Sequence, residues 1–195
     1  MDLRIETSPE VYEPAEDTFL IARALAKEVR KHDIVLDMGT GTGILALIAA
    51  RKARFCIGVD INRKALELAW KNAKLNNVRN VMFVFSDLFS NIKGSFDLIV
   101  FNPPYLPGDE EEIKEDIDRA LIGGKGGGEI IQKFLQEVKG YLEPGGRVLL
   151  VYSSLTKPDP EKLFRTKGFK TEIIDSEKLF FEELYVMRAE LSSHW

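Results

Sequence analysis

The chain has 195 residues, of which 45% are hydrophobic and 30% charged, and its formal net charge at pH 7 is −4. These values are typical of one globular domain with a full core, so we expect residues 1–195 to form a single domain. The acidic balance argues against direct nucleic-acid binding, which calls for a basic surface. One cysteine and two histidines allow no internal disulfide and predict no metal site. The charged N-terminus and the short apolar runs predict neither a signal peptide nor a membrane span, so we expect a cytoplasmic protein.

Strand-like and helix-like segments alternate along the chain, which predicts an α/β fold with a mainly parallel sheet. Short apolar runs predict five strands, at residues 34–36, 55–59, 81–85, 96–101 and 147–152. Two final strands are expected at residues 170–174 and 183–187.

Helical periodicity predicts five helices between the strands. Pro14 opens the first, residues 44–53 form the second, and Asn62 caps the third. The last two are expected at residues 130–142 and 158–168, the latter ending at a glycine. The residues expected on buried faces are Phe19, Ala22, Ala26 and Val29 in the first helix and Ala65, Leu68, Ala69 and Leu75 in the third.

A glycine-rich turn, Asp37-Met38-Gly39-Thr40-Gly41-Thr42-Gly43, follows the first predicted strand and opens a helix. Glycines let the backbone approach a ligand closely and adopt positive φ. A dinucleotide fingerprint fits only if it starts at Gly41 and ends at Ala46, which leaves a nicotinamide cofactor as one alternative. Asp37 favours a different ligand, because an acid at a strand end repels a pyrophosphate and attracts an ammonium group.

Two more acids stand at the ends of the next two strands. Asp60 ends the second strand, where open α/β sheets present a carboxylate to ribose hydroxyls, and Asp87 follows the third, where a carboxylate can accept from an adenine amine. Each acid alone is more often a helix cap or a turn residue. Together with Asp37 they predict a ligand with an amino group, a ribose and an adenine but no phosphates, which describes S-adenosylmethionine.

The tetrapeptide Asn102-Pro103-Pro104-Tyr105 follows the fourth predicted strand. Proline has no N–H and pushes the preceding residue towards extended geometry, so the Asn102 side-chain oxygen and the Pro103 carbonyl are expected to face one spot. Two acceptors beside an aromatic ring suit a planar –NH2 group of a substrate. For the tetrapeptide alone, a loop exit with a turn is the alternative, and Tyr105 is equally compatible with plain packing.

A long irregular segment, residues 104–129, comes next. It is acidic early, at residues 109–112, and glycine-rich late, at residues 123–128. A loop of this length inside a compact domain is usually a lid, a binding loop or disordered. An acidic run is more often simply a solvated surface.

The chain resembles the class I S-adenosylmethionine-dependent methyltransferases, and more closely the HemK-like protein glutamine N5-methyltransferases of the archaeal and eukaryotic release-factor branch. The resemblance rests on residues 37–43, on residues 102–105 and on the opening block Tyr12-Glu13-Pro14-Ala15-Glu16-Asp17-Thr18. It implies a Rossmann-like fold, with a seven-stranded, mostly parallel sheet, helices on both faces and an antiparallel last strand. The site residues it implies are Asn102, Pro103, Pro104 and Tyr105 for the substrate amide and Thr18, Asp37, Gly39, Gly41, Asp60, Asp87 and Asn102 for the cofactor.

The implied activity is methyl transfer from S-adenosylmethionine to a glutamine side-chain amide of a protein, specifically the Gly-Gly-Gln loop of a translation release factor. An N6-adenine DNA or RNA methyltransferase is the alternative, because the tetrapeptide suits an exocyclic amine as well. The net charge of −4 and the lack of an appended basic domain weigh against that alternative. A second alternative is a non-catalytic scaffold subunit, against which the intact set of cofactor residues counts.

The predicted strand at residues 81–85 is expected at one edge of such a sheet. It is apolar on both faces and contains neither lysine nor proline, with which proteins usually protect an exposed edge. Helices can cover its faces but cannot satisfy its outward N–H and C=O groups, so we expect another chain to add a strand here. The resemblance implies that this partner is a small zinc-ribbon activator protein.

Overall fold

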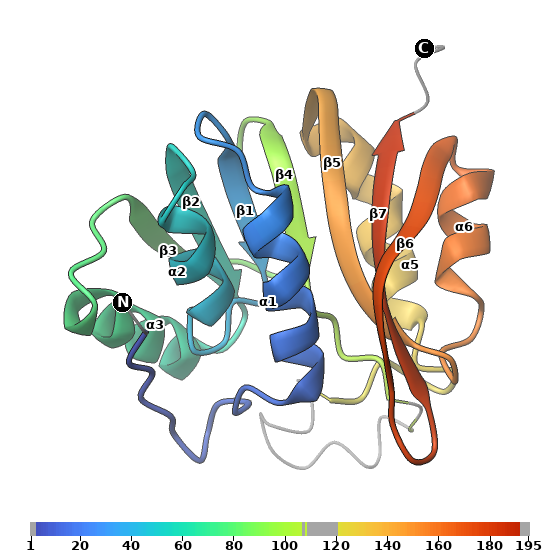
Figure 1. Cartoon of the computed structure of the whole chain (residues 1–195), viewed down its shortest axis with the longest axis horizontal. Coiled ribbons are helices and arrows are strands. Elements are labelled where there is room, and N and C mark those ends of the chain that lie inside the picture. The colour runs from blue at the N-terminus through green and yellow to red at the C-terminus, as the bar shows by residue number, and fades with distance from the viewer. Residues whose placement is uncertain (1–2, 107, 109–120, 192–195) are drawn as a thin grey trace.

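The computed structural model describes residues 3–106, 108 and 121–191, and their strands form one seven-stranded sheet in the order β3-β2-β1-β4-β5-β7-β6 (Figure 1). Strands β1 to β5 run parallel, and β7 lies antiparallel between β5 and β6. This confirms the predicted fold class. The strands are β1 Ile34–Met38, β2 Phe55–Asp60, β3 Val81–Phe85, β4 Phe96–Phe101, β5 Leu142–Ser153, β6 Phe169–Lys178 and β7 Glu183–Leu191.

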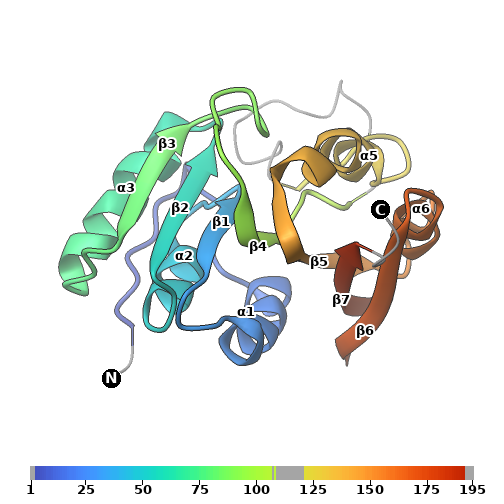
Figure 2. The ribbon, with the colours of Figure 1, turned by 90° about the horizontal axis from the view of Figure 1, so that it is seen from above.

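Helices cover both faces of the sheet, so that the core is divided into two apolar layers (Figure 2). One layer lies under α1 Glu16–Glu28, α2 Ile44–Ala50 and α3 Arg63–Leu75. The other lies under α5 Glu129–Glu137, the 3-10 helix η2 Val138–Tyr141 and α6 Pro160–Thr166. None of the helices that the structure describes has the length and apolar character needed to cross a membrane.

The buried face of α1 differs from the predicted one. Ala22 and Val29 are buried as expected, but Phe19 is 52% exposed and Ala26 is also exposed. Other apolar side chains are buried instead, namely Leu20, Ile21, Ala24 and Leu25. In α3 the prediction fails only for Leu75, the last residue of the helix, which is 40% exposed.

Several predicted element ends were also wrong. The expected helix at 130–142 ends as α5 at Glu137, and η2 then tightens the chain around Gly140, a poor α-helix former. The second helix ends at Ala50, three residues early. Strands β6 and β7 extend well beyond the predicted ranges, because they pair with each other as a hairpin whose outer part carries polar residues.

A buried arginine joins α1 to the end of the sheet where β1 and β4 begin. Arg147 is 1% exposed, and it donates to the Asp33 carboxylate at 2.6 Å and to the Asp97 carbonyl at 3.1 Å. A third bond goes to the carbonyl of Glu28, the last residue of α1. This network holds α1 in place from its C-terminus, which leaves the opposite end of the helix beside the carboxyl ends of the strands.

Candidate active site

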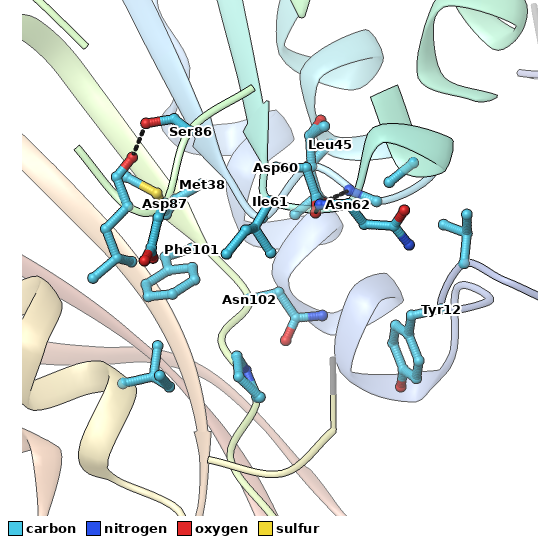
Figure 3. Close-up of a pocket in the computed structure, with 18 of the residues that line it drawn as sticks. Tyr12, Met38, Leu45, Asp60, Ile61, Asn62, Ser86, Asp87, Phe101 and Asn102 are labelled. Carbon is cyan, nitrogen blue, oxygen red and sulfur yellow. Dashed lines mark hydrogen bonds between the residues drawn. The ribbon is translucent and has the colours of Figure 1, made fainter. Parts of the chain in front are cut away.

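A cleft of about 1140 Å³ opens at the carboxyl ends of β1 to β4. Its walls come from the glycine-rich turn after β1, the end of β2, the residues after β3 and the end of β4, and Tyr12 also lines it (Figure 3). Thr18 of α1 is another of its lining residues. Strand order reverses between β1 and β4, and open α/β sheets bind ligands at such a switch point.

Asp37 is fully buried and holds the glycine-rich turn in place through hydrogen bonds. Its Oδ2 accepts hydrogen bonds from Thr40 Oγ1 at 2.6 Å and from Ala46 N at 3.0 Å, and burial raises the pKa of Asp37 to about 7. Its Oδ1 is buried and has no hydrogen-bond partner among the described residues. Asp37 therefore shapes the turn from behind the cleft wall, and its expected contact with a ligand ammonium group stays a prediction.

Gly43 shows why this turn needs glycine. Its φ is +83°, and a Cβ there would stand 2.9 Å from the Ala69 Cβ of α3. A side chain at this position would therefore be strained in its backbone and would also push α3 away from α2. The tight junction of the two helices brings the start of α3 to the rim of the cleft.

Asp60 and Asp87 both line the cleft, as predicted, from the ends of neighbouring strands (Figure 3). Asp60 accepts from Gly41 N and Asn62 N, each at 2.9 Å, and burial raises its pKa although these backbone bonds oppose the shift. A carboxylate oxygen has two acceptor sites, so both Asp60 oxygens retain capacity for a ligand. Asp87 is exposed to the cleft, and its backbone N–H bonds Ser90 Oγ at 3.1 Å.

Apolar side chains complete the wall between these two acids. They are Met38, Ile61, Leu88 and Phe101. Two carboxylates among apolar groups fit an adenosine, because the acids can accept from ribose hydroxyls and from an adenine amine while the apolar groups cover the ring. The residues present therefore fit the adenosyl part of S-adenosylmethionine.

Asn102 follows β4 and has its amide orientation fixed by α1. Its Nδ2 donates to Asp17 Oδ2 at 3.1 Å and to Thr18 Oγ1 at 3.3 Å. Because a carboxylate can only accept, the nitrogen must face α1 and the oxygen must point away from it. That oxygen, Oδ1, is buried without a hydrogen-bond partner among the described residues. The structure thus leaves Asn102 with one free acceptor, and its expected convergence with the Pro103 carbonyl stays a prediction.

Asp17 is the residue that sequence reasoning missed. It is 4% exposed, and besides Asn102 it accepts from Tyr12 Oη at 3.1 and 3.2 Å, from Thr18 N at 2.5 Å and from Thr18 Oγ1 at 3.1 Å. These donors are all neutral, and the Asp17 charge acts on the hydroxyls of Tyr12 and Tyr105. An acid in the first turn of a helix is normally explained by the helix dipole, and for this reason only Thr18 of the opening block was assigned a role.

The tetrapeptide presents its residues differently. Pro104 lines the cleft, Pro103 is buried, and Tyr105 packs against the core layer under α1 and is not among the cleft-lining residues. Burial, followed by the Asp17 charge, raises the pKa of Tyr105 and of Tyr12, so both hydroxyls stay neutral at pH 7. The predicted contact of Tyr105 with a substrate amide stays a prediction.

The glycine-rich end of the long loop, residues 123–128, lies against the backbone of the tetrapeptide and of Leu106. Gly123 N donates to Leu106 O at 2.9 Å, and a Cβ on Gly127, where φ is +73°, would stand 2.1 Å from the carbonyl oxygen of Tyr105. The glycine stretch can therefore lie directly on the tetrapeptide backbone. The acidic run at residues 109–112, and with it most of the predicted lid or binding loop, lies outside the described residues.

Comparison with known proteins gives consistent results. The family model described as "Methyltransferase small domain" matches residues 3–178. A Methanocaldococcus jannaschii protein named "Putative protein N5-glutamine methyltransferase" is 47% identical over 191 residues, covering 96% of this chain and 95% of its own length. A Deinococcus radiodurans "Release factor glutamine methyltransferase" is 33% identical over 180 residues, covering 88% of this chain and 64% of its own length.

A similar solved structure is the E. cuniculi Mtq2–Trm112 complex, described as responsible for the methylation of the eRF1 translation termination factor. The matched chain superimposes with a TM-score of 0.75 at 29% sequence identity, covering 94% of this chain and 99% of that one. The likeness therefore extends over nearly the whole of both chains.

We predict that Asp17→Ala lowers the rate of methyl transfer about 10- to 100-fold, which corresponds to the loss of one charge-assisted hydrogen bond of about 1.5–3 kcal/mol. Without the carboxylate, the Asn102 amide can turn and lose the orientation of its free oxygen. Steady-state kinetics with saturating cofactor would measure the effect. The matched control is Glu16→Ala, an exposed acid one residue away, and equal rates for the two variants would contradict the role of Asp17.

Proposed function

This chain belongs to the methyltransferase small domain family and, within it, to the protein N5-glutamine methyltransferases, and we propose that it methylates the glutamine of a Gly-Gly-Gln loop in a translation release factor. It is an S-adenosylmethionine-dependent enzyme. The observation that carries the chemistry of the acceptor is the buried Oδ1 of Asn102, which lacks a partner among the described residues while Asp17 holds the amide nitrogen. A primary amide offers the N–H donor that this oxygen lacks, as an exocyclic amine also would, and the glutamine methyltransferases among the relatives favour the amide.

The proposed chemistry requires orientation more than a strong base. When bound, the cofactor supplies an electrophilic methyl group on a sulfonium. An amide nitrogen is a poor nucleophile because its lone pair is delocalised. Asn102 Oδ1 and the Pro103 carbonyl would accept the two N–H bonds of the glutamine, which places the nitrogen and offsets the positive charge it gains. The buried charge of Asp17 also stabilises the positive charge that develops on the glutamine nitrogen. After methyl transfer, this nitrogen loses one proton to water.

We assign the cofactor side of the cleft to the residues predicted for it. Asp60 would accept from the ribose hydroxyls and Asp87 from the adenine amine, while Gly39 and Gly41 allow close approach of the backbone. Thr18 and Asp37 would contact the amino-acid part of the cofactor. Support comes from the position of Thr18 in the cleft lining and from the unpartnered buried oxygen of Asp37.

Two broader statements belong to the same proposal. All seven described strands join one sheet, which supports our proposal that residues 1–195 form a single methyltransferase domain. Release factors act on ribosomes, and we therefore propose that the enzyme works in the cytoplasm.

We also propose that the outer edge of β3 binds a small zinc-ribbon activator protein. Among the described strands β3 pairs only with β2, and its Met82 side chain is 39% exposed. The outward N–H and C=O groups of such an edge can pair with a strand from another chain. The E. cuniculi Mtq2 structure, which resembles this chain, is a complex with Trm112.

The first prediction of this proposal concerns the cofactor. Asp60→Ala should weaken S-adenosylmethionine binding about 10- to 100-fold, because a charge-assisted hydrogen bond of about 1.5–3 kcal/mol is lost. Isothermal titration calorimetry measures the dissociation constant. Glu67→Ala, which removes an exposed acid from α3, serves as the control. Equal affinities in the two variants would exclude the ribose position for Asp60.

The second prediction concerns the acceptor. Labelled cofactor is offered with purified release factor, DNA and RNA in separate reactions, and the product is mapped by mass spectrometry. We expect one methyl group on the glutamine of the Gly-Gly-Gln loop, and we expect Asn102→Ala to abolish transfer while cofactor affinity is largely retained. Label in nucleic acid alone would overturn the proposed acceptor. Near-normal turnover of the variant would overturn the role of Asn102.

The third prediction concerns the edge of β3. Coexpression with a zinc-ribbon activator should raise hydrogen-exchange protection at Val81–Phe85 and improve solubility of the chain. Met82→Lys should weaken the association, because a charge on an edge strand opposes strand addition. The amides of β1 at the centre of the sheet provide the internal control. The proposal is wrong if the chain alone is soluble and fully active and if β3 has the same exchange rate in both samples.

A further inference from the structure

Two aromatic side chains project from the turn between β6 and β7. Phe180 and Phe181 are 91% and 86% exposed, far more than any other large apolar side chain that the structure describes, and their rings pack edge to face with centroids 4.6 Å apart. Burial of a phenylalanine side chain normally stabilises a fold. Neither of these exposed rings stabilises the chain in this way. An exposed aromatic pair of this kind is typical of a surface that contacts another molecule.

Hydrogen bonds and core packing fix the turn that carries the aromatic pair. Leu179 N donates to Glu182 O at 2.8 Å and closes the turn, and Leu179 itself packs against the core layer under α1. Glu183 is tied to the loop after β5 by two hydrogen bonds with Ser154, at 2.8 Å from Ser154 N and at 3.1 Å to Ser154 Oγ. The rings are therefore presented from a fixed base.

The turn lies at the substrate end of the molecule. Figure 1 shows the β6–β7 hairpin reaching past the carboxyl ends of β4 and β5, at the same end as the start of α1, which carries Asp17. Phe101, the residue before Asn102, pairs with Leu150 of β5, and Ser154 follows the end of that strand. Glu182 also approaches the tetrapeptide, since its charge is one of those that, after burial, act on the hydroxyl of Tyr105. The aromatic pair thus stands beside the substrate side of the cleft.

We propose that Phe180 and Phe181 dock the methyl-acceptor protein by contacting an apolar depression on the part of that protein that flanks its glutamine loop. The proposal rests on the proposed function, since a glutamine that reaches Asn102 on a loop brings the folded body behind it to the rim of the cleft. Aromatic side chains are enriched at the centres of protein interfaces and often carry much of their binding energy.

The arrangement of the sheet separates this docking site from the proposed activator site. Strand β3 is at one edge of the sheet, and β6 is at the other. A partner that adds a strand to β3 therefore leaves the β6–β7 turn open. The acceptor protein and the activator would bind to opposite sides of the enzyme and would not compete.

The test compares a folded release factor with a short synthetic peptide that contains only the Gly-Gly-Gln loop sequence. For the double variant Phe180→Ser, Phe181→Ser we expect kcat/KM with the protein to fall about tenfold or more, mainly through KM, as for the loss of interface hot spots. The value with the peptide should stay unchanged. Leu75→Ser, which removes an exposed leucine at the end of α3, is the control and should change neither value. Cofactor affinity equal to that of the wild type shows that the variant is folded.

Two results with the variant would overturn the docking site. One is methylation of the protein at the wild-type rate, and the other is an equal loss with protein and peptide, which would mean that the turn serves the cleft itself. Failure of the proposed function looks different, because the wild-type enzyme would then methylate neither substrate. In that case both the proposed function and the docking site, which depends on it, would be wrong.

Discussion

The hydrogen bond between Asn102 Nδ2 and the Asp17 carboxylate joins two segments that are 85 residues apart in the chain, and the active site depends on it. It attaches the first turn of α1 to the end of β4 and leaves the Asn102 oxygen as the free acceptor. Arg147 secures the other end of α1 through the carbonyl of Glu28, the last residue of the helix. One helix, held at both ends, therefore sets the position of the group that is to receive the substrate.

Buried polar atoms without partners are rare in folded proteins, and each one calls for an explanation. Among the described residues there are five such atoms, and three of them, Asp37 Oδ1, Thr42 Oγ1 and Asn102 Oδ1, belong to the glycine-rich turn or to the tetrapeptide, while Arg147 Nε and Glu182 Oε2 lie elsewhere. The three at the carboxyl ends of β1 and β4 are what a site built for a polar ligand requires. Burial by the protein itself raises the pKa of Asp37, the residue that carries one of these atoms, to about 7.

The two edges of the sheet differ in length and in the residues that they expose. The β3 edge is short and apolar, and its unpaired backbone groups suit a strand from another chain. The opposite edge is formed by β6, whose hairpin with β7 extends past the core and carries Phe180 and Phe181 at its tip. The cleft at the carboxyl ends of β1 to β4 lies between these two edges of the sheet.

The sequence alone determined the fold class, the existence and order along the chain of all seven strands though not all of their ends, and the acids Asp60 and Asp87 at the cleft. These features are local, because apolar periodicity marks a strand and parallel strands place their carboxyl ends at one edge of the sheet. The tertiary structure decided which face of α1 is buried, the role of Asp17 and the outward position of Phe180. Each of these depends on contacts between segments far apart in the chain. A local sequence pattern does not predict which other segment will pack against a helix face or a turn.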